Sequence, residues 1–270
     1  MAAKRSRSSP KPGGKTDWQP VADWYDDHVG DDGGEFHREV VLPGTMRLLG
    51  GDAVRGERVL DVACGQGVMC RRLHEAGATV VGVDASPALI DRALERGDGE
   101  FHVGDARDLS RFAGECFDAA TCLLAVANIH PIRPVFEGMA AAIREGGSVV
   151  MVTNHPAFRG AKETHWGWDD EAKVQYRRVD RYLSPRKSPI TTHPGDVDRG
   201  YTWTFHRPVG HYVKALRQAG LLVDAMEEWP SHKTSGPGPR QKAENLTRKE
   251  IPMFLAIRAL KIAMPSLPLS

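Results

Sequence analysis

The feature that most constrains the fold is an apolar stretch that contains an acid and runs into a glycine-rich turn. Residues 59–67 read VLDVACGQG, with Asp61 in the apolar stretch and with Gly65 and Gly67 in the turn. A helical pattern follows over 68–75. Glycine has no Cβ, so the backbone of such a turn can approach a ligand closely. A strand, a glycine loop and a helix in this order predict the binding site of a nucleotide-type cofactor.

Apolar segments alternate with helical patterns along the chain. We expect strands over 58–62, 79–83, 100–103, 117–125, 148–152, 221–227 and 253–260, and helices over 68–75, 86–96, 134–144 and 208–219. Ser86-Pro87 marks a helix start, because serine caps helices and proline suits their first position. The pattern predicts an α/β fold, with a doubly wound, seven-stranded and mostly parallel sheet that ends in an antiparallel hairpin.

Five parts follow from this reading. We expect a disordered basic tail over 1–16, an N-terminal helical cap over 17–50, a cofactor-binding core over 51–154, a lid insertion over 155–205 and the rest of the core fold over 206–270. In the cap, residues 40–49 have helical spacing, with Pro43 at a helix start or kink. The lid is aromatic without clear periodicity, and residues 230–250 are predicted to form a polar loop.

The composition of the chain limits which partners, compartment and metals are expected for it. The net charge of +1 makes a nucleic-acid partner improbable, and the chain has no apolar run of about 18 residues that would span a membrane. The four cysteines, Cys64, Cys70, Cys116 and Cys122, form no C-x-x-C pair, so we expect buried free thiols and a cytoplasmic location. The histidines lack metal-ligand spacing, and no metal is expected. The oligomeric state stays open.

The glycine turn departs from the dinucleotide fingerprint of nicotinamide enzymes. That fingerprint has a third glycine where this chain has Cys70, and it needs no acid where this chain has Asp61. A pyrophosphate disfavours an adjacent carboxylate, whereas a cofactor with a cationic end is attracted by one. The turn therefore favours a cofactor such as S-adenosylmethionine, which carries an ammonium and a sulfonium.

The segment from Asp61 to Gly67 resembles motif I of the class I S-adenosylmethionine-dependent methyltransferases, (D/E)-x-G-x-G-x-G, with Ala63 in place of the first glycine. Residues 80–84, VVGVD, resemble motif II, and residues 104–106, GDA, resemble motif III. Residues 117–120 and 143–147 resemble the start of strand four and the turn before strand five. The resemblance covers about residues 55–155, and the order of elements extends it to about 262.

This resemblance implies roles for individual residues. Asp84 would bind the ribose hydroxyls, Asp105 would accept from the adenine amine, and Asp61 would orient the ammonium directly or through water. Tyr25 resembles a tyrosine of the N-terminal region that closes over the cofactor. The full cofactor set comprises Tyr25, Asp61, Ala63, Cys64, Gly65, Gly67, Asp84, Ala85, Asp105, Ala106 and Leu124.

The acceptor side should lie beyond the end of strand four, at the switch point of the sheet. His130 is the candidate base there, Asn128 could orient a hydroxyl, and His37 is a second candidate base; each could equally be a packing residue. Candidate substrate contacts are His28, His37, Trp166, Tyr182, Trp203 and His206. The segment at 123–131 lacks the (D/N)-P-P-(Y/F) motif of enzymes that methylate base amines or glutamine, and it lacks the carboxylates of a magnesium site.

The function predicted from these observations is methyl transfer to an oxygen or nitrogen of a small molecule, by in-line displacement. The aromatic lid favours a partly apolar acceptor of moderate size. Three alternatives stay open at this point: a methyltransferase acting on RNA or protein, which the basic tail supports, a nicotinamide-dependent oxidoreductase, and a non-catalytic cofactor-binding protein.

Overall fold

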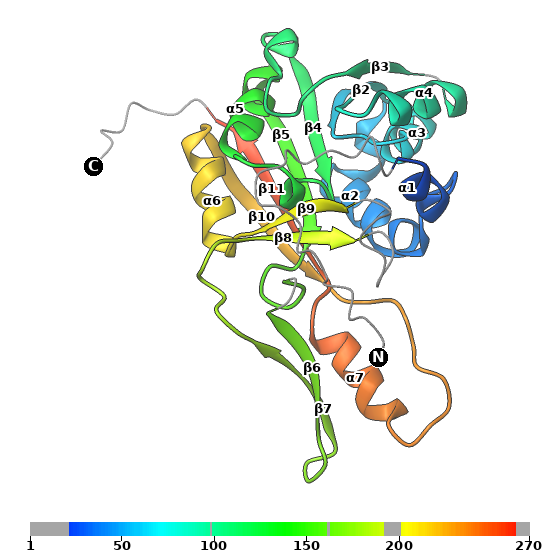
Figure 1. The fold of residues 1–270 in the computed structure, drawn as a ribbon. Coiled ribbons are helices and arrows are strands. Elements are labelled where there is room, and N and C mark those ends of the chain that lie inside the picture. The colour runs from blue at the N-terminus through cyan, green and yellow to red at the C-terminus, as the bar shows by residue number, and fades with distance from the viewer. Residues whose placement is uncertain (1–21, 98, 161–162, 192–200, 263–270) are drawn as a thin grey trace, which may run out of the picture.

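The computed structural model describes residues 22–97, 99–160, 163–191 and 201–262. Seven strands form one sheet in the order β10-β11-β5-β4-β1-β2-β3 (Figure 1). Their bounds are β1 Arg58–Val62, β2 Thr79–Asp84, β3 Glu100–Val103, β4 Phe117–Leu123, β5 Ile143–Asn154, β10 Leu221–Trp229 and β11 Phe254–Lys261. β11 is antiparallel to both of its neighbours, and the pairings among β1 to β5 are parallel. The predicted sheet is confirmed.

Helices cover both faces of the sheet, because alternate strand residues point to opposite sides. Leu60 and Val62 of β1 belong to the core beneath α5 and α6, whereas Val59 belongs to the core beneath α2 and α3. α4 packs beside β2 and β3, and the Ser86 hydroxyl accepts the Leu89 N–H at its start, 3.3 Å away. The bounds are α2 Leu42–Leu48, α3 Val68–Glu75, α4 Pro87–Arg96, α5 Arg133–Ala142 and α6 Val209–Gln218.

The N-terminal cap begins in the described residues with α1, Ala22–Val29, and continues through a π-helix, His37–Val41, into α2. Pro43 lies in the first turn of α2, as a helix start, where its missing N–H costs little. Short 3-10 helices lie at Gly51–Val54, Ser110–Phe112 and Val126–Asn128. The predicted basic tail, residues 1–16, lies outside the described residues.

The insertion after β5 is more regular than expected. It contains two antiparallel hairpins, β6 Thr164–Asp169 with β7 Val174–Val179, and β8 Arg186–Thr191 with β9 Tyr201–His206. Among the described residues of these strands, Trp203 is the single buried apolar side chain, and the other buried residues, Thr164, Ser188 and Thr202, are polar. The apolar alternation that predicts a strand is therefore weak here. In Figure 1 the β6–β7 hairpin and helix α7, Gln241–Glu250, extend together away from the sheet.

Two further expectations are wrong. Residues 230–250 are not all loop, because Gln241–Glu250 forms helix α7. Its sequence contains neither glycine nor proline, and Thr247 is its single buried residue, so the helix has no apolar stripe to reveal it. Cys116 is exposed, just before β4, with a φ of 56°, whereas Cys70 and Cys122 are buried and Cys64 is partly buried.

In the described part of the chain, no helix is both long and apolar enough to cross a membrane.

Candidate active site

The loop between β1 and α3 has a backbone conformation that suits small residues. Ala63, Gly65 and Gly67 have positive φ angles of 56°, 56° and 82°. A Cβ on Gly65 would lie 3.5 Å from the hydroxyl of Tyr25, so the loop and the cap approach each other closely there. A left-handed conformation costs a non-glycine residue about 1–2 kcal/mol. The left-handed backbone at this position explains why motif I has a glycine there, and Ala63 adopts the same conformation at a modest cost in free energy.

Asp84 ends β2 and holds this loop in place. One of its carboxylate oxygens accepts the N–H of Gly65 and the other accepts the N–H of Ser86, each at 2.9 Å. The side chain is buried, which raises its pKa, while the backbone donors act in the opposite direction. A carboxylate offers about four lone-pair positions. Acceptor capacity is therefore left for the hydroxyl groups of a ligand.

Asp61 lies beneath the loop and is 2% exposed. Its oxygens accept the hydroxyl of Thr121 at 2.6 Å and the thiol of Cys70 at 3.3 Å. Burial raises the pKa of Asp61 to about 6. Cys70, which replaces the third glycine of the dinucleotide fingerprint, thus serves as a hydrogen-bond donor to the acid of motif I.

The ends of β1, β2, β3 and β4 open into a cavity of about 660 Å³, within the range of small-molecule sites. Most of the residues predicted from the sequence line it. They are Tyr25, Ala63, Gly65, Asp84, Ala85, Asp105, Ala106 and Leu124 of the cofactor set, and His37, Asn128, His130 and His206 of the catalytic and substrate sets. The parallel topology brings these distant segments together, because the carboxyl ends of parallel strands meet at one edge of the sheet.

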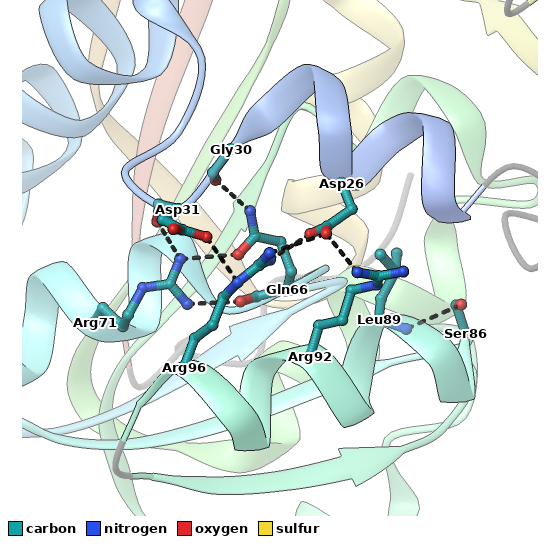
Figure 2. Close-up of polar contacts among 9 residues, drawn as sticks. All are labelled: Asp26, Gly30, Asp31, Gln66, Arg71, Ser86, Leu89, Arg92 and Arg96. Carbon is teal, nitrogen blue, oxygen red and sulfur yellow. Dashed lines mark hydrogen bonds and ion pairs between the residues drawn. The ribbon is translucent and has the colours of Figure 1, made fainter.

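The cap is fastened to α4 by a buried acid (Figure 2). Asp26, in α1, accepts from Arg92 at 2.7 Å and from both terminal nitrogens of Arg96. The Arg96 hydrogen bond is the main cause that holds the pKa of Asp26 below its usual value. Tyr25, the neighbour of Asp26 in α1, is thereby positioned against Gly65.

A second set of bonds joins the cap to the glycine loop itself (Figure 2). The Gln66 side-chain amide donates to the Gly30 carbonyl at 2.6 Å, and Arg71 donates to the Gln66 carbonyl at 2.7 Å. Arg71 also donates to the carbonyl of Asp31 at 2.5 Å. The loop and the cap therefore form one hydrogen-bonded unit at this end of the cavity.

His130 is held by a neighbouring arginine. Arg207 donates to its Nδ1 at 3.2 Å, and the ring stacks on Phe205 with centroids 5.0 Å apart. Burial lowers the pKa of His130, and Arg207 lowers it further, so the ring is neutral at pH 7. Since an arginine only donates, the proton of the neutral ring lies on Nε2. This arrangement favours His130 as a hydrogen-bond donor over the predicted role as a base.

Comparisons with known proteins agree with this geometry. The family profile described as "Methyltransferase domain" matches residues 59–147. A dTDP-3-amino-3,6-dideoxy-alpha-D-glucopyranose N,N-dimethyltransferase of Streptomyces fradiae is 30% identical over 246 residues, which are 84% of this chain and 93% of the relative. The chain belongs to the class I S-adenosylmethionine-dependent methyltransferases. The cofactor of this family is S-adenosylmethionine, and the nicotinamide alternative is thereby excluded.

Two other known methyltransferases are similar to this chain, one over less than half of it and one over most of it. A ubiquinone biosynthesis O-methyltransferase of Coxiella burnetii (strain Dugway 5J108-111) is 31% identical over 111 residues, 39% of this chain, and the chain spans about half of its length, 47%. The crystal structure of an S-adenosylmethionine-dependent methyltransferase from Mesorhizobium loti superposes with a TM-score of 0.65 at 26% identity, covering 83% of this chain and 99% of that one.

The residues at the cofactor end fit S-adenosylmethionine. Gly65 leaves space where a Cβ would stand, and Asp84 keeps acceptor positions for a ribose diol. Asp61 does not line the cavity, so the predicted attraction for an ammonium would act through the field of its charge or through a water. Asp105 lines the cavity but is 46% exposed in its side chain and pairs with Arg107 at 2.5 Å. An adenine amine would share that carboxylate with Arg107.

Several predicted residues lie elsewhere. Cys64 and Gly67 belong to the loop but do not line the cavity, and Trp166 lines a separate cavity of about 310 Å³. The Tyr182 hydroxyl accepts the N–H of Val209 at 2.8 Å and thereby braces the start of α6. Trp203 is buried, with the Lys187 ammonium 3.9 Å above its ring. The side chain of His28 lies outside the described structure.

Sequence reasoning missed other residues of the cavity wall. They are Leu89, Gly104, Arg107, Leu123, Ala125, Ile129, Pro185, Arg186, Lys187, Phe205, Arg207 and His211. Since the acceptor side was expected beyond the end of strand four, Ala125 and Ile129 could have been found in that way, and Phe205 and Arg207 are sequence neighbours of the predicted substrate contact His206. For Arg186 and Lys187 the missing information was the pairing of β8 with β9. No group of three or more metal-ligating side chains occurs among the residues that the structure covers.

Proposed function

We propose that this methyltransferase transfers a methyl group from S-adenosylmethionine to a nitrogen or oxygen atom of a small molecule. The observation that carries the proposal is one cavity that Gly65 and Asp84 line together with residues of the β8–β9 hairpin such as Phe205. Its volume, about 660 Å³, is that of a site for small molecules.

The two relatives support different acceptor atoms. The Streptomyces fradiae relative, whose similarity covers 84% of this chain, is named as an N,N-dimethyltransferase of an amino sugar nucleotide. The Coxiella relative, named as an O-methyltransferase, is similar over 39% of this chain. Because the longer similarity includes the acceptor side of the chain, we expect an amine to be the better acceptor.

The chain's residues contribute mainly by positioning the acceptor. S-adenosylmethionine, when bound, supplies a methyl group that needs no further activation. Asn128 and His130 line the cavity after β4, and both can hydrogen-bond the acceptor so that its lone pair faces the cofactor end. Orientation of this kind lowers barriers by up to about 7–11 kcal/mol. His37, which also lines the cavity, is the candidate base, and a base would add roughly 10²–10⁴-fold for a protonated nucleophile.

The proposal is tested by incubating the protein with S-adenosylmethionine and a panel of small amines and phenols. Release of S-adenosylhomocysteine and the mass of the methylated product are both measured, with Asp84→Ala as the inactive control. Cofactor binding without any product would instead support a non-catalytic binding protein. Product on RNA or protein alone would move the assignment to the macromolecular alternative.

A further inference from the structure

A second cavity, of about 310 Å³, lies where the β6–β7 hairpin meets helix α7. It shares no lining residue with the cavity of the candidate active site. The buried Thr247 of α7 donates its hydroxyl to the carbonyl of Gln175 in β7 at 3.0 Å, and Gln175 lines the second cavity. The helix and the hairpin are therefore bonded to each other at this wall, in the part of the molecule that extends away from the sheet in Figure 1.

The charged side chains that line this second cavity, among the described residues, are Arg159, Arg248 and Glu244. Neither guanidinium forms a hydrogen bond or an ion pair with a residue that the structure describes, and Nε of Arg248 is buried. Burial also lowers the pKa of Arg159. Glu244 forms no ion pair with either arginine in the described part of the chain. Two cations therefore line the second cavity without a bonded counter-ion from these residues.

A third arginine lies next to these two. The Cζ atom of Arg177 stands 4.7 Å from the centre of the Trp166 ring, which lines the cavity, and Arg177 donates to the Thr164 hydroxyl. Its Nε is buried and has no hydrogen-bond partner within the described ranges. Burial lowers the pKa of Arg177, and the charge of Arg159 lowers it further. The guanidinium groups of Arg159 and Arg177 are therefore close enough to repel each other.

The acid beside Phe36, another residue of the wall, is already engaged. Glu35 pairs with His232 at 2.7 Å and with Lys233 at 2.6 Å. Among the described residues, Glu244 is therefore the one carboxylate of this wall that opposes three guanidinium groups, and the second cavity keeps a net positive charge. A partly buried cation without a partner is costly, and a bound anion reduces that cost.

Much of the remaining wall is apolar or aromatic. Its residues of this kind are Phe36, Trp166, Ile251, Pro252 and Met253. We propose that the second cavity is a ligand site that binds an organic anion, with a carboxylate or phosphate group at Arg159 and Arg248 and an apolar body against this wall. Guanidinium groups bind both anions with charge-assisted hydrogen bonds, which are about twice as strong as neutral ones. The site is separate from the cavity of methyl transfer, so the inference goes beyond the proposed function.

The test is calorimetric titration of the protein with benzoate, with phenyl phosphate and with the neutral benzamide. We expect at least one of the two anions to bind, and benzamide to bind more weakly than that anion. Arg159→Gln and Arg248→Gln should each weaken the binding of the anion about tenfold or more, because each removes a charged donor. Glu244→Gln removes the carboxylate of the wall and should strengthen the binding about twofold or more.

Lys249→Gln is the matched control. Lys249 is an exposed cation of α7 and the neighbour of Arg248 in sequence, but it does not line the second cavity. Its replacement should change the affinity by less than about twofold. Arg248→Gln should unfold at the same temperature as the wild type or higher, because its side chain has no partner to lose among the described residues. This variant therefore tests the site in a folded protein.

The outcomes separate the possible answers. Binding of benzoate alone assigns a carboxylate ligand, binding of phenyl phosphate alone assigns a phosphate, and binding of both assigns the anionic chemistry that they share. The inference is overturned if neither anion binds or if benzamide binds as tightly as the anions. It is overturned as well if Arg248→Gln and Lys249→Gln weaken the anion equally, because the anion would then bind outside this cavity.

Discussion

Replacement of Asp84 by asparagine tests the cofactor end most directly. The two carboxylate oxygens accept the N–H groups of Gly65 and Ser86 and are the proposed acceptors of the ribose hydroxyls. Asparagine keeps one acceptor oxygen and replaces the other by a donor, so one backbone N–H and one hydroxyl would face an N–H₂ group. A hydrogen bond to a charged group contributes about 1.5–3 kcal/mol.

We therefore expect Asp84→Asn to weaken S-adenosylhomocysteine binding by about 2–3 kcal/mol, roughly 30- to 150-fold in Kd. Stability should change less than affinity, because the substitution also removes a buried charge whose burial raises its pKa. Isothermal titration calorimetry measures the affinity, and thermal unfolding reports the stability of the same preparation.

Asp118→Asn is the matched control. Asp118 also accepts a backbone N–H, that of Arg58 at 2.8 Å, and it pairs with Arg144 at 2.7 Å. It lies near the start of β4, however, at the amino-terminal ends of the strands and away from the carboxyl ends that form the site. It should lower stability and leave the Kd unchanged. A Kd of Asp84→Asn within about threefold of wild type, or an equal loss in Asp118→Asn, would refute the reasoning.

Three further predictions follow from the site. Burial raises the pKa of Asp61 to about 6, and an ammonium is attracted only by the ionised carboxylate. The affinity for S-adenosylhomocysteine should therefore fall as the pH drops below 6, and Asp61→Asn should flatten this pH dependence. Binding titrations at pH values above and below that pKa measure both effects. His130→Ala should lower kcat at least about tenfold with little change in the Kd of the cofactor. His130→Gln keeps an N–H donor and should retain more activity than His130→Ala. Steady-state kinetics with the identified acceptor measure both variants. Asp26→Ala should lower the free energy of unfolding by about 2 kcal/mol and weaken the binding of S-adenosylhomocysteine, because α1 loses its ion pairs with Arg92 and Arg96. Asp32→Ala, at an exposed position, should change neither quantity. Denaturant titration measures the stability and calorimetry measures the binding.

The cofactor end could be predicted because its residues follow strand ends in short, contiguous motifs. Asp84 ends β2 and Asp105 comes shortly after β3, and a parallel sheet places those strand ends together whatever the loops do. The indirect place of Asp61 could not be predicted in the same way. It depends on Thr121, a neighbour across the sheet, and on Cys70, one turn into α3, which together hold the carboxylate beneath the loop.

The acceptor end depends on pairings that the sequence does not encode locally. Trp166 and Tyr182 were chosen as aromatic lid residues, yet hairpin register carries Trp166 to another cavity and the chain uses Tyr182 to brace α6. The same register brings Arg186 opposite His206 and Lys187 opposite Phe205. Because the buried residues of β8 and β9 include the polar Ser188 and Thr202 beside Trp203, apolar alternation does not predict which side faces the cavity.

Three arginines hold loops that make no sheet bonds, and two of them, Arg107 and Arg207, line the cavity of the candidate site. Arg71 donates to the Asp31 carbonyl at 2.5 Å, Arg107 to the His130 carbonyl at 3.2 Å, and Arg207 to the Ile129 carbonyl at 2.5 Å. Each arginine is distant in sequence from the loop that it holds. Carbonyl partners fix the position of a guanidinium without neutralising its charge. Arg207 therefore fixes the loop after β4 through carbonyls and keeps its positive charge beside His130, whose pKa it helps to lower.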